Sequence, residues 1–200
     1  MKKVLLVIFS AVLLLSNTNL LAQNREHLKF MGISMDMNVN SFVKKLKQKG
    51  LIYVKEDNKL IVLTGKFAGH NNCNIFIFPN SENKVQCCAT YLTYRDDWKN
   101  LQTDYITIKN MLIKKYGKPM SDEEEWDGVK PTTDYEKMTA VRNGKCKYYT
   151  SFYVNGGLIS MCISDVLGYG QVNLKYIDRL IDYIGKNNGK IDRENGIEDL

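Results

Sequence analysis

His70 and Cys73 are the two residues of this sequence whose types and spacing come closest to a catalytic pair. A cysteine thiol becomes an effective nucleophile when a nearby base, such as an imidazole ring, takes up its proton. Both residues belong to the segment 69–73, whose Gly-His-Asn-Asn start is typical of a turn. The pair therefore leaves open a small hydrolase or thiol enzyme that uses His70 or Cys73.

Motifs of the common catalytic classes are missing from the sequence. It contains no G-x-S-x-G, no H-E-x-x-H, no glycine-rich phosphate loop and no EF-hand loop. A zinc site needs several converging ligands, but His70 and Cys73 supply two and His27 is the only other histidine. We therefore expect no metal, no cofactor and no catalytic residue, and we favour a protein that is not an enzyme.

The cysteines allow several arrangements, because an odd number leaves at least one thiol unpaired. In a predicted hairpin, Cys73 faces Thr90 and lies diagonal to Cys88 on the same face. A bridge between Cys73 and Cys88 is the disulfide that this register allows, and small buried residues in a sheet core are the alternative. The pairing stays open among Cys73, Cys87, Cys88, Cys146 and Cys162.

Acidic side chains gather in the segment 122–127, which reads Asp-Glu-Glu-Glu-Trp-Asp. Such a cluster could hold a calcium ion or a basic partner. However, Ser121 followed three residues later by Glu124 matches a capping box, and carboxylates stabilise the N-terminus of a helix. We therefore interpret the acidic residues as a helix cap or short turn.

One face of a predicted hairpin points to binding. Residues 147–164 read as two strands around Asn155-Gly156, a turn that places Tyr149 opposite Cys162. Alternate side chains of the hairpin read as core, and the opposite face carries tyrosines with small neighbours, which suit recognition of sugars, peptides or proteins. A second helix covering that face is the alternative. The candidate binding residues are Tyr149, Tyr153 and Leu158.

Two helices are predicted from apolar spacing and caps. The first begins after Asn38 and ends at Gly50. The second is longer, begins after Asp96 or Asp97, and ends at Gly117. It carries one apolar stripe, which indicates packing on a sheet. The stripe consists of Trp98, Leu101, Tyr105, Ile108 and Leu112.

The segment 133–143 has two interpretations. Thr133 could cap a helix that runs to Asn143, whereas Asn143-Gly144 is also a strong hairpin turn. The remaining alternating segments predict strands, so that a helix followed by a run of strands occurs twice. This order favours the α+β class, with antiparallel sheets and one long packed helix. The predicted strands cover 27–33, 51–54, 59–68, 73–78, 84–95, 147–154, 158–164 and 171–177.

The first 22 residues have the pattern of a secretory signal peptide. Lys2 and Lys3 precede the apolar run 4–15, which is too short for a membrane span but suits an export signal, and the small residue Ala22 suits the cleavage position. We therefore expect a periplasmic or secreted protein. The net charge of +6 is too small to favour nucleic acid as a partner. We expect a single domain at 23–186, with two halves at about 23–96 and 97–186 as the alternative, and a polar tail at 187–200.

Several segments spread along the chain resemble a family of uncharacterised exported bacterial proteins. The resemblance implies export and a single α+β domain, and it brings no established activity. The order of helices and strands is also loosely similar to the beta-lactamase-inhibitor-protein fold and to small envelope-assembly proteins, which is a likeness of fold alone. The segments that carry the family resemblance are 27–33 (HLKFMGI), Phe42-Val43 to Gly50, 65–69 (GKFAG), Trp98 and Tyr105 leading to 115–119 (KYGKP), and 144–146 (GKC).

The function that these features favour is an exported, non-enzymatic binding module that recognises a protein or an envelope component. A small-molecule carrier is an alternative, with its ligand between the helix 97–117 and the sheet. The other alternative is the enzyme that uses His70 or Cys73.

Overall fold

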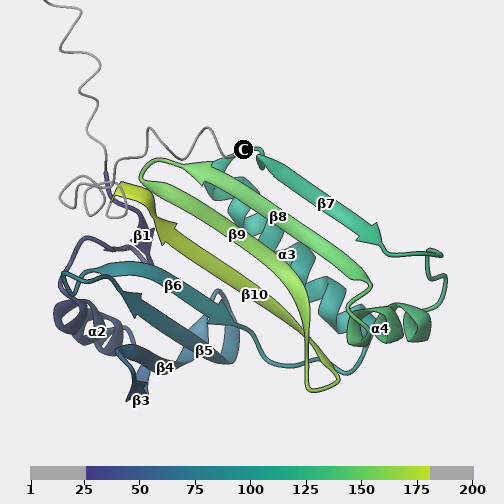
Figure 1. Cartoon of the computed structure of the whole chain (residues 1–200), viewed down its shortest axis with the longest axis horizontal. Coiled ribbons are helices and arrows are strands. Elements are labelled where there is room, and N and C mark those ends of the chain that lie inside the picture. The colour runs from purple at the N-terminus through teal and green to yellow at the C-terminus, as the bar shows by residue number, and fades with distance from the viewer. Residues whose placement is uncertain (1–25, 181–200) are drawn as a thin grey trace, which may run out of the picture.

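The computed structural model describes residues 26–180, which form three helices and ten strands (Figure 1). The expected signal peptide, the expected tail and the end of the expected domain lie outside the described residues. The helices are α2 (Val39–Gln48), α3 (Trp98–Tyr116) and α4 (Asp134–Arg142). The strands are β1 (Lys29–Phe30), β2 (Ile33–Ser34), β3 (Ile52–Asp57), β4 (Leu60–Phe67), β5 (His70–Pro79), β6 (Val85–Tyr91), β7 (Ser121–Trp126), β8 (Cys146–Val154), β9 (Gly157–Val166) and β10 (Tyr169–Asp178).

Eight strands form one antiparallel sheet in the order β3-β4-β5-β6-β10-β9-β8-β7. Each half of the sheet is a meander of four strands that follows a helix, with α4 inserted in the second meander. The halves join where their last strands, β6 and β10, pair with each other. The predicted α+β class, with a helix followed by strands occurring twice, is therefore confirmed, and both halves belong to one continuous sheet.

Local side-chain caps define all three helices. The side chain of Asn38 accepts a hydrogen bond from Asn40 N–H at the start of α2, and Asp97 accepts one from Asn100 N–H at the start of α3. Thr133 and Glu136 form a capping box at the start of α4. The helical interpretation of 133–143 is therefore correct, and the hairpin alternative is wrong.

The acidic segment 122–127 is not the start of a helix. It belongs to the edge strand β7, which pairs with β8 so that Glu124 faces Tyr148. Lys109 of α3 reaches this strand, with its Nζ atom 2.6 Å from Asp122 Oδ1 and 3.1 Å from Glu124 Oε1. Pairing with β8 and with the lysine therefore outweighs the local spacing that resembles a capping box.

The two hairpin registers differ in how well they could be predicted. Tyr149 lies opposite Cys162, as the Asn155-Gly156 turn requires. In the β5–β6 hairpin, Thr90 pairs with Ile75 and not with Cys73, which is two residues from the predicted register, and the pair carries a bulge between Phe78 and Pro79. A shift of two residues keeps every side chain on its predicted face.

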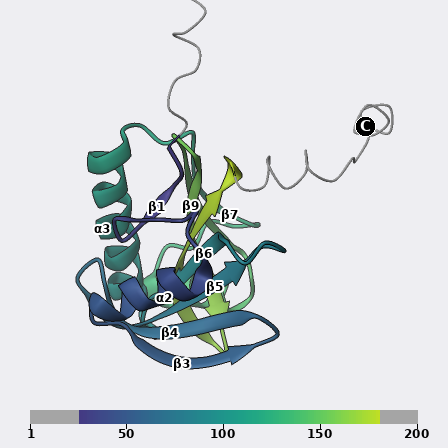
Figure 2. The same ribbon diagram turned by 90° about the vertical axis from the view of Figure 1, so that its left-hand side faces the viewer.

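All three helices lie on the same face of the sheet. The stripe of α3 packs on β8, β9 and β10, and the buried residues of α2 and α4 join the same core cluster. Figure 2 shows the ribbons of α2 and α3 against the sheet. The β1–β2 hairpin also lies on this side, since Phe30 contacts Phe67 and Tyr176. The core therefore occupies one side of the sheet, and alternate side chains point to the other.

Candidate functional site

The candidate site is the face of the sheet that none of the described helices covers, which we call the uncovered face. Figure 1 looks onto this face at β8, β9 and β10, with α3 behind them. Side chains alternate along a strand, so residues two apart share a face. Tyr149 and Tyr153 of β8 therefore point away from the core that contains Tyr148 and Phe152.

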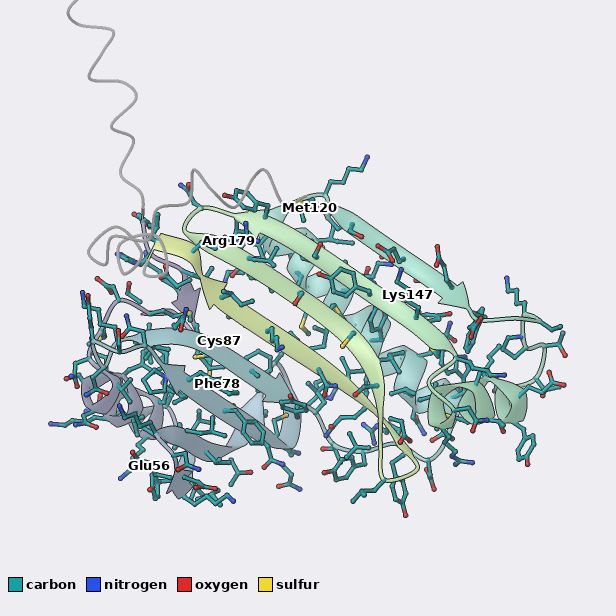
Figure 3. The ribbon with its side chains drawn as sticks, in the orientation of Figure 1. Glu56, Phe78, Cys87, Met120, Lys147 and Arg179 are labelled. Carbon is teal, nitrogen blue, oxygen red and sulfur yellow. The ribbon has the colours of Figure 1, made fainter. Side chains whose placement is uncertain are left out.

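Five side chains from five neighbouring strands form a continuous row on the uncovered face, which we call the apolar row. Phe78 pairs with Cys87, Cys87 with Ile177, Ile177 with Leu158, and Leu158 with Tyr153. Figure 3 shows Phe78 and Cys87 side by side on β5 and β6. Phe78 is 38% exposed and Tyr153 is 65% exposed, whereas the three residues between them are partly buried. The apolar row is therefore more exposed to solvent at its two ends than in its middle.

Two cations lie beside the middle of this row. Lys175 precedes Ile177 by two positions on β10, between Ala89 and Ser160, and its side chain is exposed. Arg179 follows Ile177 by two positions, and its guanidinium carbon lies 5.5 Å from the centroid of the Tyr153 ring. Within residues 26–180, neither cation has a carboxylate within ion-pair distance.

Two acidic residues of the uncovered face, Glu123 and Glu125, lie at its β7 edge beside one cation. Lys147 of β8 pairs with Glu123 and lies 3.9 Å from Glu125. The hydrogen bond with Lys147, together with one from Ser121, lowers the pKa of Glu123, and the same pairing raises the pKa of Lys147. With two carboxylates and one ammonium group, these three residues leave a net charge of −1 at this edge.

The structure puts all three candidate binding residues on the uncovered face. Tyr153 and Leu158 belong to the apolar row, and Tyr149 lies two pairs further along this face, beyond Ser151 and between Cys162 and Glu123. Within the described chain, no second helix covers them. Their role in binding stays a prediction.

His70 and Cys73 do not form an accessible nucleophile and base. Cys73 is fully buried, and its sulfur lies 3.6 Å from the backbone oxygen of His70. Burial raises the pKa of the Cys73 thiol, which favours its unreactive form. The imidazole of His70 instead lies 3.8 Å from Asp104, whose carboxylate is held at 2.7 Å by Arg95. These contacts have a structural role, since they join α3 to β5 and to the segment before α3.

All five cysteines are free thiols in the structure. Cys88 is fully buried on the core side, and Cys87 lies on the uncovered face. Burial raises the pKa of both thiols. Within residues 26–180, no group of three histidine, cysteine or acidic side chains is arranged to hold a metal ion.

The space between α3 and the sheet, where a carried ligand was expected, is filled by side chains. Trp98, Tyr105 and Ile108 of α3 are buried there, and the Tyr105 hydroxyl lies 2.6 Å from the Thr150 hydroxyl. A cavity of about 520 Å³ lies elsewhere, between α4 and the loop that follows β7. Its walls include Trp126, Pro131, Tyr135, Thr139 and Asn143.

Sequence reasoning missed the residues that extend the face beyond the β8–β9 hairpin. Phe78, Cys87 and Ile177 join the apolar row only because β6 pairs with β10, a contact between residues far apart in the sequence. Alternation within the predicted strand 171–177 could have placed Lys175 and Ile177 on one face. It could not have shown that this face is uncovered.

Comparison with known proteins finds no matching family model, no matching curated protein and no matching solved structure. The described part of the chain has no helix that is both long and apolar enough to cross a membrane. The functional argument therefore depends on the geometry of the uncovered face.

Proposed function

We propose that the protein is an exported binding module that recognises a protein or an envelope component through the uncovered face of its sheet. The observation that carries the proposal is the apolar row, in which five strands each contribute one side chain to a face without a described helix over it. Contact with a partner would remove this apolar surface from water, which is favourable. Tyr153 offers both an aromatic ring and a hydroxyl, a combination enriched at interfaces.

The face can be tested by comparing matched variants. Tyr153→Ala combined with Leu158→Ala removes the β8–β9 end of the apolar row, whereas Tyr53→Ala removes a tyrosine of β3 that is 44% exposed and lies opposite Leu63 on the other face of the sheet. Each protein is immobilised, incubated with an envelope extract of the producing cell, and washed, and the retained proteins are identified by mass spectrometry. We expect a partner that the wild type and Tyr53→Ala retain and the double variant loses. Equal retention of the partner by all three proteins would show that the uncovered face is not its binding surface.

Export is a separate part of the proposal and is supported by the pattern of residues 1–22. The mass of the protein purified from the envelope fraction tests it. We expect a chain that begins near Gln23, and a full-length chain would contradict export.

A second candidate function is a small-molecule carrier, which is favoured by the cavity beside α4 and not by the filled space under α3. Trp126 and Tyr135 offer aromatic surfaces to a ligand there. Native mass spectrometry of the purified protein tests this candidate. A non-covalent adduct that Tyr135→Ala loses would support it, and an adduct-free mass would count against it.

A further inference from the structure

We infer that the uncovered face binds a protein segment in which apolar side chains are flanked on both sides by carboxylates. This inference rests on the proposed function and adds the chemistry of the partner. Its basis is the position of Lys175 and Arg179 relative to the apolar row.

The two cations bracket the apolar row at its middle strand. Lys175, Ile177 and Arg179 are spaced by two residues, so Ile177 lies in the row and one cation lies on each side of it. Four residues of extended chain separate the cations by about 13 Å. The row itself crosses five strands and is about 19 Å long, since neighbouring strands are about 4.8 Å apart. The result is a strip one side chain wide with positive charge on both flanks.

Among the residues that the structure describes, no carboxylate pairs with either cation, so both are available to a ligand. The neighbours of Lys175 across the sheet, Ala89 and Ser160, are short, and they leave the space around the ammonium group open. Arg179 lies over the Tyr153 ring, which positions its guanidinium next to the exposed end of the apolar row. A guanidinium binds a carboxylate through two parallel hydrogen bonds, and an ammonium group binds it as a point charge.

A second copy of this chain does not place its carboxylates over the two cations when the same faces meet at β10. The acidic residues that share the uncovered face lie on the two edge strands: Glu123 and Glu125 lie on β7 beside Lys147, and Asp57 lies on β3 opposite Leu60. Two uncovered faces that meet at β10 would therefore bring four cations together, with the described carboxylates of this face at the outer strands. This arrangement favours a different, acidic partner.

A narrow segment fits the strip better than an anionic membrane surface does. Cys87, Ile177 and Leu158 in the middle of the apolar row are partly buried, so a flat layer of headgroups would touch mainly the ends of the row. The most exposed apolar side chains of the described chain, Val129 and Leu167, lie outside the row. A single peptide segment can place one line of apolar side chains along the row and its carboxylates over the two cations.

The experiment uses the full mature chain and a phage library that displays random linear peptides. Three proteins are panned in parallel: the wild type, the charge reversal Lys175→Glu with Arg179→Glu, and a control reversal Lys118→Glu with Lys130→Glu. Lys118 and Lys130 are also exposed but lie outside the face, so the control changes the net charge equally. A fourth protein carries Tyr153→Ala and Leu158→Ala.

We expect the wild type and the control to enrich peptides in which Asp or Glu flanks apolar residues. The affinity of a selected peptide should fall at least about tenfold in the charge reversal, which corresponds to about 1.4 kcal/mol. The same peptide with lysine in place of its acids should bind the charge reversal better than the wild type.

The other outcomes overturn the inference in distinguishable ways. If apolar peptides without acids are enriched and only Tyr153→Ala with Leu158→Ala loses them, the inference is wrong and the proposed function stands. If no peptide is enriched on the wild type relative to that double variant and phosphatidylglycerol vesicles do not bind either, both are wrong. If no peptide is enriched but phosphatidylglycerol vesicles bind the wild type and not the charge reversal, an anionic lipid surface replaces the protein partner.

Discussion

Arg179 lies over the ring of Tyr153, with 5.5 Å between the guanidinium carbon and the ring centroid, and this contact links the cationic and aromatic parts of the uncovered face. An exposed contact of this kind contributes about 0.5–1 kcal/mol. Since Tyr153 is 65% exposed, Tyr153→Ala should lower the free energy of unfolding by no more than about 1 kcal/mol. Urea denaturation measures the change. A much larger loss would show that Tyr153 supports the fold. Weaker binding by its variants could then not be distinguished from partial unfolding.

Asp104 should matter for stability. Its carboxylate lies 2.7 Å from Arg95 Nε and 3.3 Å from Arg95 Nη2, and it is almost buried on α3. Because the Arg95 side chain is 32% exposed, water weakens the pair, and we expect Asp104→Asn to cost about 1–2 kcal/mol. Asp96→Asn, at an exposed position nearby, should change stability by less than about 0.5 kcal/mol. Equal effects of the two substitutions in urea denaturation would refute the structural role of Asp104.

Gly156 and Gly144 allow backbone strain to be separated from steric contact. Both have positive φ, so an alanine costs about 1 kcal/mol at either site. A Cβ atom at Gly156 would lie 2.2 Å from the backbone oxygen of Glu26, but a Cβ atom at Gly144 would meet nothing within 4 Å. Gly156→Ala should therefore cost about 1–3 kcal/mol more than Gly144→Ala. Thermal unfolding at similar midpoints for both variants would contradict the packing of the N-terminal segment on this turn.

The capping box of α4 should make stability depend on pH. Glu136 accepts hydrogen bonds from the backbone N–H groups of Thr132 and Thr133, which lower its pKa from 4.5 to about 2. Because the folded-state pKa is the lower one, the carboxylate stabilises the fold above pH 4.5, and this contribution is lost as the pH falls from 4.5 to about 2. The difference in melting temperature between the wild type and Glu136→Gln should therefore shrink over this range. Circular dichroism melts at several pH values measure it, and a constant difference would show that the carboxylate does not cap the helix.

Helix starts and one hairpin register could be predicted from the sequence because the interactions that set them are local. Asn38, Asp97 and Thr133 each accept a hydrogen bond from a backbone group two or three residues away. The Asn155-Gly156 turn fixes the register of β8 and β9 because it joins two adjacent strands directly.

Contacts between distant residues explain what the sequence did not reveal. β7 is a strand because its backbone pairs with β8 and because Lys109 pairs with Asp122 and Glu124, and neither partner is close in sequence. The predicted β5–β6 register differs from the observed one by two residues, and the bulge after Phe78 cannot be recognised from alternation alone. The uncovered face was predicted as a patch on one hairpin, whereas the β6–β10 pair extends it across five strands.

The most direct test of binding at the apolar row uses Cys87, which lies within it. The rate at which N-ethylmaleimide modifies each cysteine can be measured by peptide mass spectrometry, with and without a saturating peptide selected by panning. Cys146 serves as the internal control, because it is also partly exposed but lies on the helix-covered side at the β7 edge. We predict that the bound peptide slows modification of Cys87 and leaves the rate at Cys146 unchanged. An unchanged rate at Cys87 in the saturated complex would contradict binding at the uncovered face.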